Sequence, residues 1–299
     1  MSRVFLTGAT GYVGSAVLDA LVRAGHHVEA LVRNSEGAEL VQGRGGHPVL
    51  GDLSDRSTWR DAAAAADGAV HTALEPSARA PQVDAKVVEG LTTLPERPGR
   101  FLVYTSGVWV LGPTTVPADE SAALHPLELV SWRPAHERRI LDSASTGVRP
   151  IVVRPGIVYG SSRGIVGDLL KDVSNGLVRI IGTGENHWPL VYDRDLGELY
   201  ARLIGTTAAD GIYHANDQGD ESVNEIVAAF GEHVQIAPSV RHVPPTEARK
   251  KMGPYADALA ADQIVRSPRA RALGWSPTLR SVAGNAARLI EEWRRGQAA

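Results

Sequence analysis

Short apolar runs alternate with segments of helical periodicity through the first half of the chain. Between Tyr12 and Ala24, apolar residues recur every three or four positions, which is the spacing of one helix face. Apolar runs of three to five residues are too short for helices and are expected to be strands: Val4–Thr7, Val28–Val32, Pro48–Leu50, Ala69–Ala73, Phe101–Thr105 and Pro150–Val153. Because helices of this length separate the strands, the pattern predicts an α/β fold with a doubly wound parallel sheet.

The alternation loosens after Arg154. Residues 160–167, 182–186 and 238–245 are rich in Gly, Pro and polar residues, so they are expected to be loops. Helical stretches are predicted over Thr58–Ala66, Asp193–Ile204, Val223–Phe230, Tyr255–Ala261 and Thr278–Arg295.

A glycine-rich turn joins the first expected strand to the first expected helix. It reads Gly8-Ala9-Thr10-Gly11-Tyr12-Val13-Gly14. A dinucleotide pyrophosphate needs a tight turn, close approach to the backbone and free N–H groups at a helix N-terminus. Three glycines between a strand and a helix supply these conditions, although their spacing is GxxGxxG rather than GxGxxG. We therefore expect Gly8 and Thr10–Gly14 to bind a dinucleotide.

The residues after the second expected strand bear on the choice of cofactor. An acidic side chain about 20 positions past the glycines would bind the ribose hydroxyls of NAD, whereas this chain has Arg33-Asn34 there. A guanidinium group at Arg33 can pair with the 2′-phosphate of NADP. Glu29 lies in the middle of the strand and is not expected to reach a ribose. The sequence favours NADP over NAD.

Composition removes several classes of function. The chain of 299 residues has no cysteine, which excludes disulfides, Cys-ligated metals and thiol nucleophiles. A net charge of −3 gives no electrostatic case for binding nucleic acid or an anionic membrane. His125, His136 and Glu137 do not form a recognised metal signature, so no metal is expected. No signal or membrane segment is visible, and a cytoplasmic location is the expectation.

Six segments together carry a resemblance to a known family. They are the Gly8–Gly14 turn, Gly51-Asp52-Leu53, Val70-His71-Thr72-Ala73, Tyr104-Thr105-Ser106-Gly107, Arg154-Pro155-Gly156-Ile157-Val158-Tyr159-Gly160 and Val191-Tyr192-Asp193-Arg194-Asp195-Leu196. In their order and spacing the chain resembles the extended or atypical short-chain dehydrogenases/reductases of the NAD-dependent epimerase/dehydratase group, over nearly its whole length. The resemblance implies a Rossmann fold with a small interleaved C-terminal substrate region.

The resemblance also implies roles for individual residues. Asp52 and Leu53 would contact the adenine, Thr72 and Ala73 would line the ribose, and Pro155, Gly156 and Ile157 would border the nicotinamide, with Thr105 and Arg133 also near the cofactor. The dinucleotide-binding domain would then span residues 1–160, with residues 190–230 returning to it, and residues 161–189 and 231–299 would mainly bind the substrate. Family members often dimerise, so the resemblance admits a homodimer.

The chain departs from the family in its expected proton-transfer residues. The family uses a Tyr-x-x-x-Lys pair, but the four lysines of this chain follow Gln82, Gly167, Thr246 and Glu247 at that spacing, never a tyrosine. Aligning Glu137 with a glutamate common in the family helix puts Leu129 at the tyrosine position and Arg133 at the lysine position. Because an arginine is a poor proton shuttle, another group is needed.

Four residues are candidates for catalysis, and five for binding a substrate. Ser106, Arg133, His136 and Tyr159 are the catalytic candidates, because each lies in or near the segments that match the cofactor crevice. The substrate candidates are Ser106, Trp109, Tyr159, His187 and Trp188. Each also has an ordinary structural interpretation as a packed aromatic, a surface histidine or a residue at a strand end.

Three functions remain open at this stage. The first is an NADP(H)-dependent oxidoreductase that acts on a small carbonyl or alcohol with a non-standard proton donor. The second is a nucleotide-sugar epimerase or dehydratase, whose chemistry normally depends on the missing tyrosine. The third is a catalytically silent NADP-binding sensor.

Overall fold

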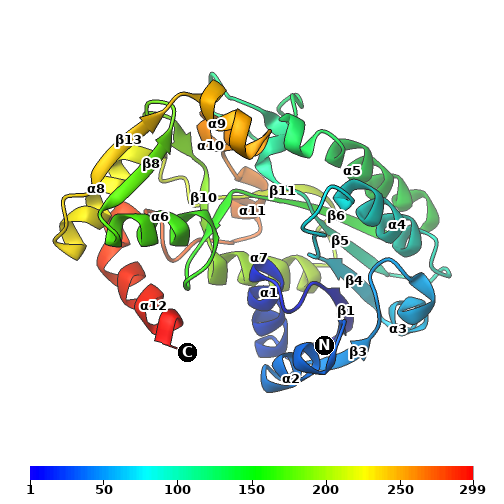
Figure 1. Cartoon of the computed structure of the whole chain (residues 1–299). Coiled ribbons are helices and arrows are strands. Elements are labelled where there is room, and N and C mark those ends of the chain that lie inside the picture. The colour runs from blue at the N-terminus through cyan, green and yellow to red at the C-terminus, as the bar shows by residue number, and fades with distance from the viewer. Residues whose placement is uncertain (299) are drawn as a thin grey trace. The chain divides into compact units, whose positions relative to one another are not determined.

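The computed structural model describes residues 1–298 (Figure 1). Its strands are β1 (Arg3–Thr7), β2 (His27–Val32), β3 (His47–Leu50), β4 (Gly68–His71), β5 (Phe101–Thr105), β6 (Arg149–Pro155), β7 (Ile157–Tyr159), β8 (Leu177–Ile181), β9 (His187–Trp188), β10 (Leu190–Tyr192), β11 (Gly211–Ala215), β12 (Glu221–Ser222) and β13 (Ser239–Val243). Its α-helices are α1 (Tyr12–Arg23), α2 (Ser35–Gly43), α3 (Arg60–Ala65), α4 (Ala80–Thr92), α5 (Arg133–Asp142), α6 (Gly164–Ser174), α7 (Asp193–Gly205), α8 (Val223–Val234), α9 (Pro245–Met252), α10 (Tyr255–Ala260), α11 (Pro268–Ala272) and α12 (Ala286–Ala298).

Seven strands form the main sheet, in the order β11-β6-β5-β4-β1-β2-β3. Each of the pairs from β6 to β3 is parallel, and Leu6 of β1 lies between Ala30 of β2 and Val70 of β4. The strand order reverses at β1 and β4, which is where a doubly wound sheet opens a crevice at the carboxyl ends of its strands. The predicted doubly wound parallel sheet is confirmed.

The helices of the sheet lie in two layers. Helix α7 packs on α1 so closely that a Cβ atom at Gly197 would meet the carbonyl oxygen of Ala16 at 2.5 Å. Helices α4 and α5 pack on each other on the other face of the sheet (Figure 1). The central strands β1, β4, β5 and β6 are buried on both faces, which explains why they are almost continuously apolar in sequence.

The chain forms two compact units. The first, here called unit 1, comprises residues 1–106, 132–154 and 196–213, and the second, unit 2, comprises residues 107–131, 155–195 and 214–299. Unit 2 contains three short strand pairs, of which β7–β10 and β8–β13 are parallel and β9–β12 is antiparallel. Its core combines residues of α6, α8 and α12 with the strands, and includes Tyr159, Leu170, Trp188 and Phe230.

The last helix begins later than its periodicity suggests. The periodicity predicts a helix over Thr278–Arg295, but α12 begins at Ala286 after a 3₁₀ turn over Ala283–Asn285. Two buried carboxylates account for the difference. Asp195 accepts hydrogen bonds from the backbone N–H groups of Thr278 and Leu279, while Glu221 accepts those of Val282 and Ala283. These side chains fix the backbone in a non-helical path.

Two segments expected to be loops are partly regular. Residues 239–243 form β13, which gains its regularity by pairing with β8, and α6 begins at Gly164 inside the expected loop at 160–167. In the other direction, the helix expected over Thr58–Ala66 is divided into a 3₁₀ turn over Arg56–Thr58 and the shorter α3. Asp55 caps the turn by accepting from the N–H of Ser57 at 3.0 Å.

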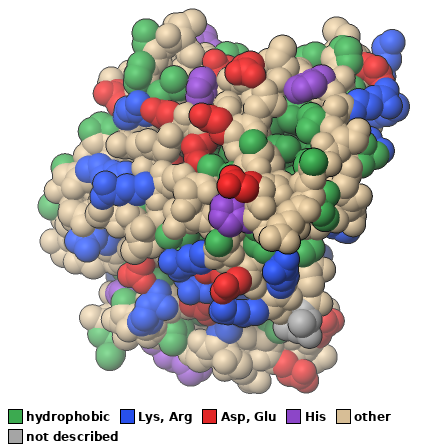
Figure 2. Space-filling view, turned by 90° about the vertical axis from the view of Figure 1, so that its left-hand side faces the viewer, with side chains coloured by type: hydrophobic (Ala, Val, Ile, Leu, Met, Phe, Trp, Pro, Cys, Tyr) green, Lys and Arg blue, Asp and Glu red, His purple; other side chains and the backbone are tan. Residues whose placement is uncertain are grey.

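The surface carries charges of both signs. On the face shown in Figure 2, acidic and basic side chains are interspersed among polar and apolar groups. Within the described part of the chain, no helix is long and apolar enough to cross a bilayer.

Candidate functional site

The glycine turn lies at the carboxyl end of β1, where the strand order reverses. Gly8 has φ +81°, and a Cβ atom there would meet the backbone of Ala73 at 2.6 Å. A Cβ atom at Gly14 would meet the carbonyl oxygen of Gly8 at 1.9 Å. Gly11 precedes α1 in an extended conformation and no side chain caps the helix there. The glycines therefore allow close backbone packing beneath a helix N-terminus whose N–H groups suit a pyrophosphate.

Thr72 and Ala73 follow β4 and border the same turn. The hydroxyl of Thr72 donates to the carbonyl oxygen of Thr7 at 2.7 Å, and the N–H of Thr72 donates to the same oxygen at 3.2 Å. This arrangement holds the two strand ends together. The structure thus brings the predicted glycine, Thr72 and Ala73 positions into one place in unit 1.

A pocket of about 190 Å³ lies within unit 1 at the ends of β2 and β3. Arg33, Asp52 and Leu53, predicted from the sequence, line it together with Arg79. Hydrogen bonds from the hydroxyl and N–H of Ser54 are the main reason that the pKa of Asp52 is lowered, and the guanidinium groups of Arg33 and Arg79 add to the effect. Within residues 1–298, neither guanidinium forms an ion pair.

Ser106 and Thr105 lie at the carboxyl end of β5. The Oγ1 of Thr105 is 2.7 Å from the hydroxyl of Tyr200, so this side chain is used inside unit 1. Ser106 is only 7% exposed, and its Oγ has no hydrogen-bond partner in the described part of the chain. A buried hydroxyl without a partner is costly, and it marks a position where a ligand oxygen can complete the bonding.

The buried carboxylate of Asp84, on α4, lies at the centre of a polar network in unit 1. Its Oδ2 is 2.6 Å from Nδ1 of His136 and accepts from the hydroxyl of Tyr104 at 2.9 Å, while its Oδ1 is 3.1 Å from Nε2 of His71. The chain continues from Nδ1 of His71 to the hydroxyl of Thr7 at 2.6 Å. Since an ionised carboxylate only accepts, the two ring nitrogens that face Asp84 are the donors.

The charge of this network is fixed by its hydrogen bonds. Burial raises the pKa of Asp84, but the hydrogen bonds from His136 and His71 outweigh burial and hold that pKa well below its usual range. Burial also raises the pKa of Tyr104 well above its ordinary value, so this phenol stays protonated. His136 then has Nδ1 bound to Asp84 and Nε2 without a hydrogen bond in the described residues, and its side chain is 14% exposed.

Helix α5 positions Arg133 and His136. Arg133 begins the helix and donates from Nη1 to the carbonyl oxygen of Thr105 at 2.8 Å, while its guanidinium lies over the ring of Trp132 at 4.5 Å. Glu137 of the same helix accepts two hydrogen bonds from the buried guanidinium of Arg154 on β6, at 3.0 and 2.5 Å. These bonds fix the helix to the sheet.

The position aligned with the family tyrosine is not on this helix. Leu129 lies in a 3₁₀ turn over Glu128–Val130 in unit 2, whereas Arg133 begins α5 in unit 1. Pro134, at the start of α5, has no N–H and restricts the residue before it, which favours a helix boundary here. Leu129 and Arg133 are therefore not successive residues of one helix face.

Tyr159 ends β7 and belongs to the core of unit 2. It is fully buried, and its ring packs against that of Tyr192 with centroids 5.7 Å apart. Burial and the nearby carboxylate of Asp217 raise the pKa of Tyr159 far above its ordinary value. A phenol in this environment retains its proton strongly.

Pro155, Gly156 and Ile157 join β6 to β7 and are all buried. The N–H of Gly156 donates to the carbonyl oxygen of Ala215, and a Cβ atom at Gly156 would meet the carbonyl oxygen of Pro189 at 2.3 Å. They belong to unit 2, whereas the other predicted cofactor residues belong to unit 1.

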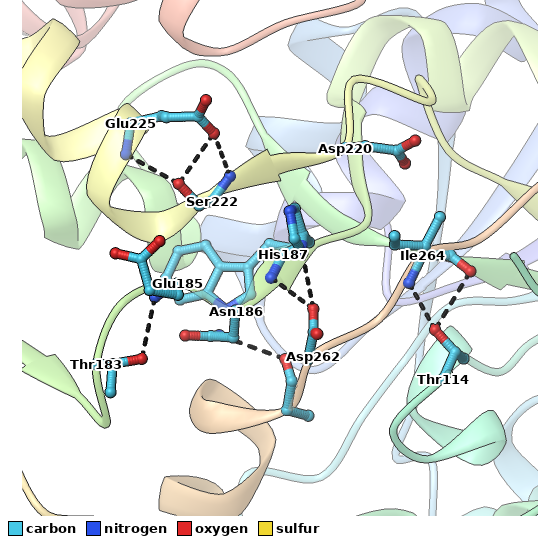
Figure 3. A network of polar contacts seen from close by, with 12 residues as sticks. Thr114, Thr183, Glu185, Asn186, His187, Asp220, Ser222, Glu225, Asp262 and Ile264 are labelled. Atoms are coloured by element: carbon cyan, nitrogen blue, oxygen red, sulfur yellow. Dashed lines mark hydrogen bonds and ion pairs between the residues drawn. The ribbon is translucent and has the colours of Figure 1, made fainter. Parts of the chain in front are cut away.

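His187, on β9, is held by a single carboxylate (Figure 3). Asp262 lies 2.9 Å from Nδ1 of His187 and accepts from its backbone N–H at 2.8 Å. The adjacent Trp188 is buried and donates from Nε1 to the carbonyl oxygen of Leu259 at 3.1 Å. Trp109 meets the ring of Tyr255 edge to face. Four of the five substrate candidates therefore lie in unit 2, namely Trp109, Tyr159, His187 and Trp188. The fifth, Ser106, lies in unit 1.

Two residues of the site were missed by the sequence reasoning. Asp84 lies in a segment for which the sequence pattern predicted no element or motif, and only the fold brings it to His71, Tyr104 and His136. Arg79 precedes α4 in a polar segment and reaches the pocket of Arg33 through the folding of the chain. The spacing of an aspartate among helical apolar residues, at Val83, Val87 and Val88, is the one signal that could have indicated a buried carboxylate.

Similarity to a family model and to other proteins places the chain in a family. Residues 4–215 match the model of the NAD dependent epimerase/dehydratase family. An uncharacterized protein of Schizosaccharomyces pombe is 31% identical over 284 residues, which cover 92% of this chain and 95% of that protein. The 4-hydroxy-2-methyl-3-oxo-4-farnesyl-3,4-dihydroquinoline-1-oxide ketoreductase of Stigmatella aurantiaca is 36% identical over 171 residues, or 53% of this chain and 51% of that enzyme.

Solved structures agree on the fold. The UDP-glucose 4-epimerase of Thermus thermophilus, in complex with NAD, superposes with a TM-score of 0.80 at 20% identity, covering 98% of this chain and 99% of that one. The human epimerase family protein SDR39U1, with NADPH, gives a TM-score of 0.77 at 21% identity, covering 97% and 99%. The chain belongs to the NAD-dependent epimerase/dehydratase family, whose members are NAD(P)-binding enzymes with a Rossmann fold.

Proposed function

We propose that the protein is an NADP(H)-dependent oxidoreductase that acts on a small carbonyl or alcohol substrate. The observation that carries the choice of cofactor is the pocket where Arg33 and Arg79 present two guanidinium groups without an ion pair in residues 1–298. The neighbouring carboxylate of Asp52 is bound by Ser54. Although Glu75 also lines the pocket, guanidinium groups that form no ion pair can each pair with a 2′-phosphate, which NAD lacks.

The cofactor can be tested by direct binding. Arg33→Gln and Arg79→Gln are each expected to weaken NADPH binding by about tenfold to a hundredfold, the usual worth of a charge-assisted hydrogen bond. NADH binding should change by less than about threefold. Titration of nicotinamide fluorescence measures both, and Arg60→Gln, an exposed arginine outside the pocket, is the control. Equal losses for NADH and NADPH would contradict the assignment to NADP.

The residues around α5 support a role for His136 in moving the proton. When bound, a nicotinamide cofactor supplies or accepts a hydride, and the protein must then give a proton to the carbonyl oxygen or remove one from the alcohol. The carboxylate of Asp84 binds Nδ1 of His136, fixes the orientation of the ring and leaves Nε2 to exchange that proton. We infer that Asp84 positions His136 and that Ser106 offers its unpartnered hydroxyl to a substrate oxygen.

The other candidates are less suited to transferring the proton. The guanidinium of Arg133 has no acceptor atom and donates to the carbonyl oxygen of Thr105, so its role is electrostatic. Tyr159 is fully buried, and its raised pKa opposes release of the proton. The relative from Stigmatella aurantiaca is by name a ketoreductase, which supports hydride transfer to a ketone as the reaction type.

A screen of aldehydes, ketones and quinones with NADPH tests the reaction. Against any substrate that is turned over, His136→Ala is expected to lower kcat by at least a hundredfold, within the usual contribution of general acid–base catalysis. Asp84→Asn should shift the pH profile of kcat because it removes the negative charge next to the imidazole of His136. His125→Ala, an exposed histidine, is the control. If Tyr159→Phe lowers kcat while His136→Ala keeps full activity, Tyr159 is the group that transfers the proton.

The same screen separates the alternatives. Turnover of UDP-glucose or a related nucleotide sugar, with no turnover of simple carbonyls, would indicate an epimerase or dehydratase. NADPH binding without turnover of any compound would favour a sensor. Absence of NADPH and NADH binding would reject all three functions.

A further inference from the structure

A cavity of about 350 Å³ lies wholly within unit 2 and lacks an assigned ligand. Its volume falls in the range of pockets that hold small molecules. Its interior is formed by buried apolar side chains of α6, β8, β9 and β13, among them Leu169, Ile181, Trp188 and Val243. Trp188 has its Nε1 satisfied by the carbonyl oxygen of Leu259, so it presents only its apolar ring to the space.

The charged residues of the cavity lie at its edge and balance one another. Three acidic residues (Asp168, Asp172 and Glu247) and three basic residues (Arg179, Arg241 and Lys251) line it, and all six are exposed or half-exposed. Arg241 already forms an ion pair with Glu247 at 3.6 Å. A diphosphate group would therefore meet as many carboxylates as cations, which offers no net attraction.

One polar group inside the lining is free to contact a ligand. The half-buried Tyr255 lines the cavity, its ring lies edge to face against Trp109, and its hydroxyl has no hydrogen bond within residues 1–298. Burial and the nearby Asp168 raise the pKa of Tyr255, so the phenol is a hydrogen-bond donor at neutral pH. A single donor in an apolar pocket orients a ligand through one acceptor atom.

We propose that this cavity binds an uncharged, predominantly apolar small molecule that carries a hydrogen-bond acceptor, with Tyr255 as the donor. Resting on the proposed function, this makes the substrate class hydrophobic carbonyl compounds with an aromatic or aliphatic body, rather than nucleotide diphosphate sugars. The apolar interior supplies most of the binding free energy, and the balanced rim gives polyanions no net attraction.

The test uses Nile red, an uncharged apolar dye with a carbonyl group whose fluorescence rises in apolar surroundings. The full-length protein is expected to bind about one equivalent of the dye, and an excess of an apolar ketone such as benzophenone should displace it. UDP-glucose at millimolar concentration should leave the dye bound. Displacement by UDP-glucose, or failure of benzophenone to displace the dye, would overturn the proposal.

Matched variants assign the dye to the cavity. Ile165 lines the cavity and is half-exposed, so Ile165→Trp fills the space with little effect on folding and is expected to weaken Nile red binding at least tenfold. Leu177→Trp adds the same ring at an exposed strand position outside the cavity and should leave the affinity within about twofold. Tyr255→Phe should weaken the binding of Nile red by about threefold to tenfold. Equal affinities in Ile165→Trp and Leu177→Trp would overturn the assignment.

The readout separates this proposal from the proposed function. NADPH binding, followed by nicotinamide fluorescence, depends on Arg33 and Arg79 of unit 1 and should be unchanged in Ile165→Trp. Loss of Nile red binding in that variant with intact NADPH binding supports the cavity alone. Normal Nile red behaviour in a protein that fails to bind NADPH would reject the proposed function and leave the ligand site standing.

Discussion

At the glycine turn, a single added carbon atom would collide with the backbone. Gly14→Ala would place a Cβ atom 1.9 Å from the carbonyl oxygen of Gly8, and neither backbone can move without disturbing β1 or α1. We expect NADPH affinity to fall at least tenfold and the free energy of unfolding to fall by about 1–3 kcal/mol, the usual cost of overpacking. Fluorescence titration and urea denaturation measure the two effects.

The control for this change is another helical glycine. Gly43 ends α2, and a methyl group added there would have no atom within 4 Å, so Gly43→Ala should leave NADPH binding unchanged. The substitution should be neutral or stabilise the protein by up to about 1 kcal/mol because alanine favours the helix. Tight NADPH binding by Gly14→Ala would show that the turn does not approach the pyrophosphate.

The buried carboxyl group of Asp217 should make the free energy of unfolding depend on pH. Burial, helped by the nearby Glu221, raises the pKa of Asp217 to about 7. In the unfolded chain the carboxyl loses its proton near pH 4, so between about pH 4 and 7 the folded state holds a proton that the unfolded state lacks. The free energy of unfolding should therefore fall as pH rises through this window, by up to about 1.4 kcal/mol per pH unit from this group.

Asp217→Asn isolates this contribution. The asparagine is neutral at every pH, so the variant should gain stability relative to the wild type as pH rises from 5 to 8. Urea denaturation at both pH values measures the difference between the two proteins, which removes the effects of all other groups. A constant difference across this range would show that Asp217 ionises normally in the folded protein.

At the scale of elements, helix α5 depends on a buried ion pair. Glu137 and Arg154 are both about 2% exposed and share two hydrogen bonds. Glu137→Gln keeps the size of the side chain but leaves the buried guanidinium without its carboxylate, which should lower the free energy of unfolding by about 3–5 kcal/mol. The loss should appear in urea denaturation at pH 7.

An exposed ion pair between α5 and α4 gives the comparison. Arg139 and Glu89 lie 3.8 Å apart with both side chains about half exposed, so Arg139→Gln should cost less than about 1 kcal/mol. Similar costs for the two substitutions would mean that water reaches Glu137 and that α5 is less firmly fixed than the structure indicates.

The bounds of the helices and strands show which elements the hydrophobic pattern can predict. The strands β1, β2 and β5 and the helix α1 agree closely with their apolar runs, because burial alone selects them. The start of α12 could not be found this way, since carboxylates of Asp195 and Glu221, distant in sequence, bind the backbone N–H groups before it. The strand β13 is exposed along most of its length and is regular because it pairs with β8.

At the scale of the whole molecule, binding of the cofactor should stabilise the folded state. A ligand at 100 times its dissociation constant raises the free energy of unfolding by about 2.7 kcal/mol. We expect NADPH to raise the melting temperature more than NADH at equal concentration, and Arg33→Gln to remove the difference. Thermal denaturation measures the shifts. A larger shift with NADH would contradict the preference for NADP.

The sequence by itself determined the doubly wound sheet, the glycine turn and the absence of a Tyr-x-x-x-Lys pair, because these depend on local periodicity, on the one residue without a side chain and on composition. Arg33, Asp52 and Leu53, which the sequence assigns to the cofactor, line one pocket, and their binding of the cofactor stays a prediction. Only the tertiary structure brought Asp84 to His136, Arg79 to Arg33 and the unpartnered hydroxyl of Ser106 to the end of β5. These contacts join residues far apart along the chain, and their geometry is set by how whole helices pack on the sheet.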